Sequence, residues 1–319
     1  MSHPGFAVVL DRCLGVRAGE QVLLIVDDGT DAEVIARLQE GVERRGAVLQ
    51  LVRIPTPSLP GEEPPLRAAA DLLAADAAIE LTSLFIGSSK ARQEATRAGV
   101  RYLAMPGVVL DTFRPDGPLD IDFDGLRGTA QRVGDAWSGG SSYRLTSVAG
   151  TELTGSITGR NGRVLDGIAR AAGGYMAPPD VEAGTAPVEG STSGVVVIDA
   201  DLLFMGTGPL PEPVVLYFRE GELTAVEGGE RDRLVDMIDR CADPRMSNLA
   251  EVSMGLNPAG SICAVPMETE SALGTAHIAL GNSIAYGGTI DARAHLDCVM
   301  AEATLEIDGE VVISNGNLV

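Results

Sequence analysis

The sequence predicts an α/β N-terminal domain with a parallel sheet, followed by an α+β C-terminal domain with a mainly antiparallel sheet. In the first half, short apolar runs alternate with amphipathic stretches, whereas the second half is rich in glycine and hairpin-like turns. A Gly/Ser-rich stretch at residues 137–142 separates the two sequence patterns. A chain of 319 residues is long enough for two domains. The predicted domains are residues 1–142 and 143–319.

The first elements read as strand, helix and strand. Residues 21–26 (QVLLIV) form a continuous apolar run, which is typical of a strand covered on both faces. Residues 31–45 repeat apolar side chains at helical spacing and stop at Gly46. A second strand at 48–54 ends before Pro55, so the unit predicts a parallel pair with a right-handed crossover.

The rest of the first half continues this alternation. Helices are expected around residues 66–74 and 89–98, and strands around 77–81 and 100–105. The loop at 27–30 lacks the spaced glycines of a dinucleotide fingerprint, so it is interpreted as a helix-capping turn and predicts no nucleotide cofactor.

Two hairpins and a helix stand out in the second half. Residues 214–226 turn at Glu220-Gly221, and residues 303–313 turn at Asp308-Gly309. Between them, residues 230–241 read as one amphipathic helix.

Charge and composition exclude whole classes of function. The chain has 24 Lys+Arg against 45 Asp+Glu, a formal charge of −21, which opposes binding to nucleic acid or an anionic membrane. No run approaches twenty apolar residues, and residues 1–15 lack the features of a signal peptide. We therefore expect a soluble, cytoplasmic protein.

Histidine is scarce, and its placement predicts a metal site. Two of three histidines, His277 and His295, lie 18 residues apart. On a strand, His295 and Asp297 would share one face, and a sheet would bring His277 opposite. Two imidazoles and a carboxylate suffice for Zn, Mn, Co or Fe(II). The alternative is a hydrogen-bonded core histidine beside a local polar pair.

Several other side chains are candidates for the same site. Glu251 is an isolated charge among small and apolar residues, so it is either a ligand or a solvated strand end. Glu182 lies in a loop-like segment, and Tyr286 either orients substrate or packs on the sheet. Glu268 and Glu270 read as a solvated helix start. Cys298 lacks a neighbour that would favour its thiolate, so a nucleophilic role is disfavoured.

Five segments together resemble a known superfamily. They are Pro179-x-x-Glu182 followed by residues 190–199 (GSTSGVVVID), then Asn248-Leu-Ala-Glu251, His277-Ile-Ala-Leu-Gly281 and His295-Leu-Asp297. Their order resembles that of the aminopeptidase T (leucyl aminopeptidase) metallopeptidases and of the shorter relatives that include 2,5-dihydroxypyridine 5,6-dioxygenase.

The resemblance implies a metal centre in the C-terminal domain. In the aminopeptidase branch it implies two metals held by Glu182, Glu251, His277, His295 and Asp297, with Tyr286 matching only loosely. In the dioxygenase branch it implies one Fe(II) held by His277, His295 and Asp297. Relatives of this kind are commonly homodimers.

Three functions follow as hypotheses. The first is a hydrolase of a small amide or peptide, in which Zn, Co or Mn activates water and Glu251, Glu182 and Tyr286 assist. The second is an Fe(II) ring-cleaving dioxygenase. The third is a non-catalytic protein that binds a small molecule, in which His295→Ala leaves ligand binding intact. All three imply a small-molecule or short-peptide ligand.

Overall fold

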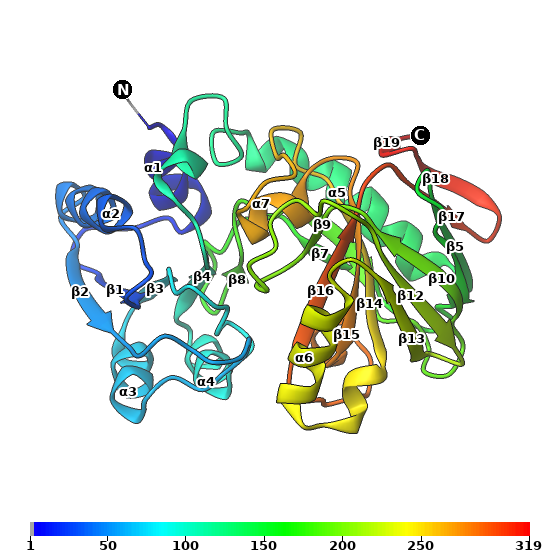
Figure 1. Cartoon of the computed structure of the whole chain (residues 1–319). Coiled ribbons are helices and arrows are strands. Elements are labelled where there is room, and N and C mark those ends of the chain that lie inside the picture. Colours follow the sequence, from blue (N-terminus) through cyan, green and yellow to red (C-terminus); the bar gives the residue numbers. More distant parts are fainter. Residues whose placement is uncertain (1–2) are drawn as a thin grey trace. The chain divides into compact units, whose positions relative to one another are not determined.

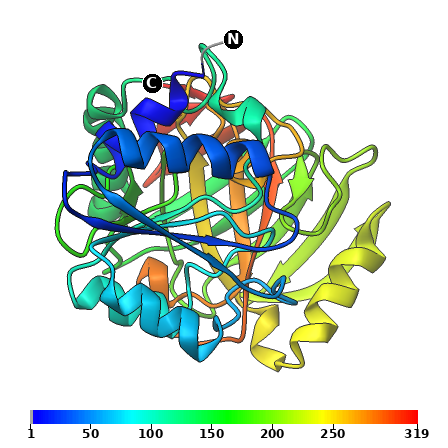
Figure 2. The ribbon, with the colours of Figure 1, turned by 90° about the vertical axis from the view of Figure 1, so that its left-hand side faces the viewer.

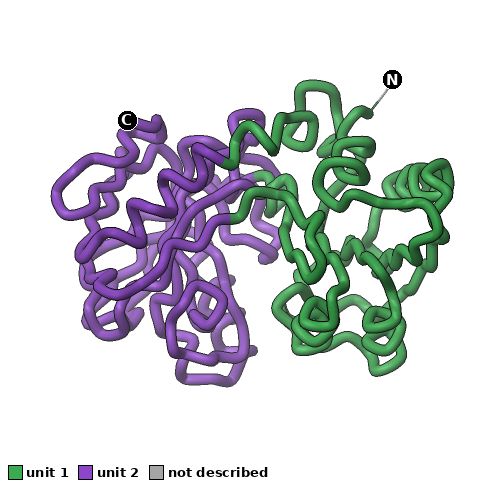
Figure 3. Tube along the Cα trace, turned by 180° about the vertical axis from the view of Figure 1, so that it is seen from behind, with its two compact units in different colours: residues 1–127, 165–180, 265–268 green, residues 128–164, 181–264, 269–319 purple. Residues whose placement is uncertain are grey.

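A computed structural model describes residues 3–319 of the chain (Figure 1). The chain forms two compact units. Unit 1 comprises residues 1–127, 165–180 and 265–268, and unit 2 comprises residues 128–164, 181–264 and 269–319 (Figure 3). The fold class is the predicted one, because unit 1 holds a parallel sheet and unit 2 holds two sheets of antiparallel pairs. The domain boundary after residue 142 stays a prediction.

Unit 1 is built on a five-stranded sheet in the order β2-β1-β3-β4-β8. Its pairs are parallel, as the β-α-β pattern predicts. Strand β1 is buried from Val22 to Val26, which explains its continuous apolar run. The strands are β1 (Gln21–Val26), β2 (Val48–Arg53), β3 (Ala77–Glu80), β4 (Arg101–Ala104) and β8 (Tyr175–Met176).

Helices cover both faces of this sheet. Helix α2 lies on one face, while α3 and α4 lie on the other (Figures 1 and 2). Helix α2 begins after Asp31, whose side chain accepts a hydrogen bond from the Glu33 amide at 2.9 Å. The helical segments are α1 (Gly5–Val8), the π-helical turn η1 (Val9–Cys13), α2 (Ala32–Arg44), α3 (Leu66–Ala74), α4 (Lys90–Arg97) and η2 (Leu110–Phe113).

Unit 2 contains two sheets. One has the strand order β13-β12-β10-β6-β5-β17-β18-β19, and the other has the order β11-β16-β15-β14-β9-β7. In the second sheet β14 and β15 are buried along their whole length. The strands are β5 (Ser142–Ser147), β6 (Glu152–Ser156), β7 (Arg163–Leu165), β9 (Glu182–Thr185), β10 (Ser193–Ile198), β11 (Asp201–Leu202), β12 (Val214–Arg219), β13 (Glu222–Gly228), β14 (Leu249–Gly255), β15 (Ala276–Gly281), β16 (His295–Met300), β17 (Ala303–Ile307), β18 (Glu310–Ser314) and β19 (Asn317–Leu318).

The predicted hairpins and helix of unit 2 are confirmed. Strands β12 and β13 turn at residues 220–221, and β17 and β18 turn at 308–309. All four turn residues have positive φ, as the tightest hairpin turns require. The helical segments are α6 (Arg231–Cys241), η3 (Pro244–Ser247), α7 (Pro266–Ser271) and η4 (Ile284–Tyr286).

The long helix α5 (Phe123–Gly139) was not predicted from the sequence. The Gly/Ser-rich stretch at 137–142 contains the end of this helix, and Trp137 is fully buried. Its indole Nε1 donates a hydrogen bond to the Ala183 carbonyl at 3.1 Å, and its ring packs edge-on against Tyr143. Trp137 thus joins α5 to strands of both sheets in unit 2. Within residues 3–319, every helix is too short or too polar to cross a lipid bilayer.

Candidate metal centre

Four neighbouring strands carry the five predicted ligands. Strands β9, β14, β15 and β16 lie side by side and pair antiparallel. Glu182 lies opposite Gly255, and His295 lies opposite Gly281. Ala279 lies opposite Glu251 on one side and Asp297 on the other. Residues that pair across strands share a face, and so do alternate residues along one strand. Register therefore places all five side chains on one face of the sheet.

Small residues separate these ligands on that face. The positions between the ligands are Gly184, Ser253, Gly255, Ala279 and Gly281. A Cβ added at Gly184, Gly255 or Gly281 would collide with neighbouring atoms, so larger side chains do not fit at these positions. The pattern of large polar and small residues thus creates a polar centre on an otherwise buried sheet.

Glu251 lies between the two histidines. Its Oε1 is 3.1 Å from Nε2 of His277, and its Oε2 is 2.9 Å from Nε2 of His295. Glu182 Oε2 is 3.1 Å from the same His277 nitrogen, and Asp297 Oδ1 is 3.2 Å from the same His295 nitrogen. Each imidazole therefore faces two carboxylates, and the two clusters share Glu251.

Three groups of side chains have ligand atoms close enough to hold one cation. They are Glu182-Glu251-His277, Glu251-His295-Asp297 and Glu270-His277-Asp297, with ligand atoms within 4.8 Å of one another in each group. None of these groups, which cover residues 3–319, contains both histidines. The first two groups share only Glu251, whose two oxygens face different imidazoles.

The protonation of the site reflects its excess of carboxylates. Burial lowers the pKa of His277, but the charges of Glu182 and Glu251 outweigh it and raise that pKa well above its ordinary value. Asp297 and Glu251 do the same for His295. Burial raises the pKa of Glu251, yet its hydrogen bonds with both histidines bring that pKa down to about 2. The same field that favours a proton on each ring favours a cation in its place.

These residues fit a bound metal. Glu182, Glu251 and Glu270 are buried, and buried carboxylates require compensating positive charge. Nδ1 of His295 lies 2.7 Å from the Asn282 carbonyl oxygen, so it donates there and leaves Nε2 as a ligand atom. Nδ1 of His277 is buried without a hydrogen-bond partner among the described residues.

Tyr286 closes one side of the centre. Its hydroxyl donates a hydrogen bond to Oε1 of Glu182, and its ring stacks on His295 with centroids 5.8 Å apart. The Arg163 guanidinium lies over the same tyrosine ring, 4.9 Å from its centroid. Tyr286 was a candidate site residue from the sequence, and in the structure it contacts both Glu182 and His295.

Comparison with known proteins places the chain in a family. A sequence model of the 2,5-dihydroxypyridine 5,6-dioxygenase family matches residues 3–319. The chain belongs to this family. No curated protein matches the chain.

Two solved structures share the fold of this chain. The structure of 2,5-dihydroxypyridine dioxygenase from Pseudomonas putida KT2440 superposes with a TM-score of 0.80 at 20% identity, covering 99% of this chain and 96% of that one. Wild-type AmpT from Thermus thermophilus superposes with a TM-score of 0.72 at 14% identity, covering 99% of both chains. The fold is thus shared with a dioxygenase and with AmpT, and the family model assigns the chain to an enzyme family.

The structure corrects one interpretation from the sequence and supports another. Glu268 and Glu270 are not a solvated helix start, because their side chains are 2% and 5% exposed. Glu268 forms an ion pair with Arg114 at 2.9 Å, and the carboxylate of Glu270 lies beside His277 and Asp297. Its position at the end of the short helix α7, close before β15, was the only available signal. Burial raises the pKa of the Cys298 thiol, so the thiolate form that a nucleophile requires is disfavoured, as the sequence indicated.

Proposed function

We propose that the protein is a metal-dependent hydrolase of a small amide or peptide with a free amino end, and that it uses two divalent cations. One observation carries the proposal: Glu251 presents one oxygen to His277 and the other to His295. A carboxylate shared in this way is what holds two like-charged ions about 3.5–4 Å apart in two-metal sites.

The proposed roles follow from position. Glu182 and His277 would hold one cation, His295 and Asp297 would hold the other, and Glu251 would be shared by both groups. When bound, such cations lower the pKa of water and polarise a carbonyl group. Glu270 lies beside His277 and Asp297, so its carboxylate would be placed to accept a proton from the water that attacks the substrate. The Tyr286 hydroxyl holds Glu182 in place through its hydrogen bond.

Ring cleavage by Fe(II) is the second candidate. The family model and one structural neighbour are both named for a dioxygenase, which supports it. Its predicted ligand set, His277, His295 and Asp297, stays a prediction, because the groups found among residues 3–319 each contain one histidine. An iron site of this kind would need one imidazole to move toward the other.

Metal content and oxygen uptake separate the two candidates. We expect about two Zn, Mn or Co ions per chain and product release that continues without oxygen. The hydrolase proposal fails if the purified protein holds one iron and consumes one O₂ for each product formed.

The bridging role of Glu251 gives a direct test by mutation. We expect Glu251→Gln to reduce bound metal from two ions to one or fewer and to lower kcat by about 100-fold or more, because a carboxamide bridges two cations poorly. Elemental analysis and steady-state kinetics measure both effects. Glu310→Gln, at an exposed strand start, is the control for loss of one negative charge. Retention of both ions in Glu251→Gln would refute the bridge.

A further inference from the structure

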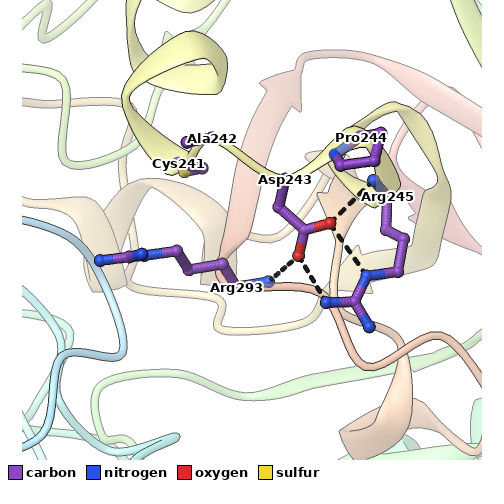
Figure 4. A pocket seen from close by; sticks show the side chains of 6 residues that line it. All are labelled: Cys241, Ala242, Asp243, Pro244, Arg245 and Arg293. Carbon is purple, nitrogen blue, oxygen red and sulfur yellow. Dashed lines mark hydrogen bonds and ion pairs between the residues drawn. The ribbon is translucent and has the colours of Figure 1, made fainter.

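Tyr286 lies in segment 282–294, which connects β15 to β16. Most residues of this segment are partly or fully exposed, so polar contacts rather than a hydrophobic core fix its course. At the end nearest β16, the Asp243 carboxylate accepts a hydrogen bond from the Arg293 backbone amide at 3.0 Å (Figure 4). The part of the segment that carries Tyr286 is held by different residues.

Two arginines of unit 2 hold the backbone around Tyr286. Arg163, the first residue of β7, donates a hydrogen bond to the Ala285 carbonyl oxygen at 2.6 Å. Arg160, three residues earlier, donates a hydrogen bond to the Gly287 carbonyl oxygen at 2.5 Å. The chain at the start of β7 thus fixes the backbone on both sides of Tyr286.

Arg163 also contacts the ring of Tyr286. The central carbon of its guanidinium lies 4.9 Å from the ring centroid. A cation at this distance is attracted by the negative face of an aromatic ring. The same ring stacks on His295, with centroids 5.8 Å apart and planes inclined by 8°. Arg163 therefore holds both the ring that covers His295 and the backbone next to it.

Through Tyr286, this arginine is linked to both halves of the metal centre. The Tyr286 hydroxyl donates a hydrogen bond to Glu182, and its ring contacts His295. Glu182 is a ligand atom donor in one of the candidate cation groups, and His295 is one in the other. A displacement of this one ring would therefore disturb a ligand of each group.

We propose that Arg163 is a positioning residue of the metal centre, and that it acts through Tyr286 on Glu182 and His295. The proposal rests on the metal centre of the hydrolase function proposed above, and not on the reaction that the centre carries out. Loss of the Arg163 charge frees the tyrosine ring to move, which weakens the hold on both cations without removing any ligand.

The test separates the charge of Arg163 from its hydrogen bond to the Ala285 carbonyl. Arg163→Gln keeps an N–H donor without the charge, so it should weaken Zn²⁺ binding by about 3- to 10-fold, the effect expected for a cation–π contact. Arg163→Lys keeps the charge and should recover part of this loss. Calorimetric titration of Zn²⁺ into chelator-treated protein measures both. Arg219→Gln, at the exposed end of β12, controls for net charge.

A double-mutant cycle with Tyr286→Leu shows whether Arg163 acts through the ring. In the Tyr286→Leu protein, Arg163→Gln should change Zn²⁺ affinity by less than about twofold, because the group that transmits its effect is absent. A merely structural role of Arg163 in β7 would give the same effect with and without Tyr286, and that result overturns the proposal. So does tighter Zn²⁺ binding by Arg163→Gln than by Arg163→Lys.

Nuclear magnetic resonance of the metal-free protein separates this proposal from the proposed function. The chain has three histidines, so ring signals of His295 can be followed in histidine-labelled protein. Arg163→Gln should move these signals and leave those of His3 in place, because the stacked tyrosine ring shifts them. If the wild type binds no Zn²⁺ but this movement occurs and is absent in Tyr286→Leu, the metal-dependent function fails and the positioning role stands. If Zn²⁺ binds and the His295 signals ignore Arg163→Gln, the positioning role is refuted.

Discussion

At the scale of single residues, Glu80 shows how burial changes a carboxyl group. It ends strand β3 and is fully buried in unit 1. Its oxygens accept hydrogen bonds from the Tyr102 hydroxyl at 2.8 Å and the Ile86 amide at 2.6 Å. Burial outweighs these bonds and raises the pKa of Glu80 to about 7.

The raised pKa predicts a stability that falls as pH rises. The folded protein holds the Glu80 proton more tightly than the unfolded chain, whose pKa is near 4.5. Its contribution is therefore fully present below pH 4.5 and is lost as pH rises through about 7, an effect of about 3 kcal/mol. Urea denaturation followed by circular dichroism between pH 4.5 and 8 measures this slope.

Glu80→Gln should remove that part of the slope, because a carboxamide stays neutral over this pH range. The exposed Glu94→Gln is the matched control and should keep the slope. Identical pH profiles for the wild type and Glu80→Gln would contradict the assignment.

At the scale of elements, close contact between β9 and β14 positions Glu182. Gly184 pairs with Ser253, and a Cβ at Gly184 would lie 2.6 Å from the Ser253 Cβ and 2.7 Å from the Val252 carbonyl oxygen. The Ser253 hydroxyl in turn donates a hydrogen bond to Oε1 of Glu251. A side chain at Gly184 would therefore push apart two strands that carry metal ligands.

Gly184→Ala should lower the free energy of unfolding by about 1–3 kcal/mol and weaken metal binding at least tenfold, because overpacking displaces Glu182 from Glu251. Thermal unfolding and metal titration measure the two effects. The control is Gly128→Ala. Gly128 is an exposed residue of helix α5, and no atom lies within 4 Å of the added Cβ. This substitution should stabilise by about 0.5–1 kcal/mol. Unchanged metal affinity in Gly184→Ala would show that the strand spacing does not set the site.

At the scale of the whole molecule, the metal centre lies entirely in unit 2. All five ligands, Tyr286 and Glu270 belong to this unit. The only tryptophan, Trp137, is also in unit 2 and is fully buried. Its fluorescence therefore reports the unfolding of the unit that binds metal.

Metal should stabilise unit 2 by mass action. Adding Zn²⁺ or Mn²⁺ to chelator-treated protein at about 100 times the Kd should stabilise it by about 2.7 kcal/mol and raise the midpoint of the Trp137 fluorescence transition. His295→Ala should show a smaller shift, because one cation group loses its histidine. A midpoint that does not respond to metal in the wild type would count against the centre.

The sequence by itself determined the features that depend on neighbouring residues. Apolar runs and helical spacing predicted the parallel unit, and the spacing of His295 and Asp297 predicted their shared face. The Glu-Gly and Asp-Gly turn residues predicted both hairpins, and these residues have positive φ in the structure. These features follow from the fixed periods of strands and helices. The homodimer and the cytoplasmic location stay predictions.

Only the tertiary structure decided the remainder. Helix α5 contains four glycines, which disfavour a helix locally, and buried contacts of Trp137 compensate for them. The sharing of Glu251 by two histidines and the approach of Glu270 depend on the register of four strands and on small residues between the ligands. These contacts join residues that are distant in the chain, so the local periodicity of the sequence cannot predict them.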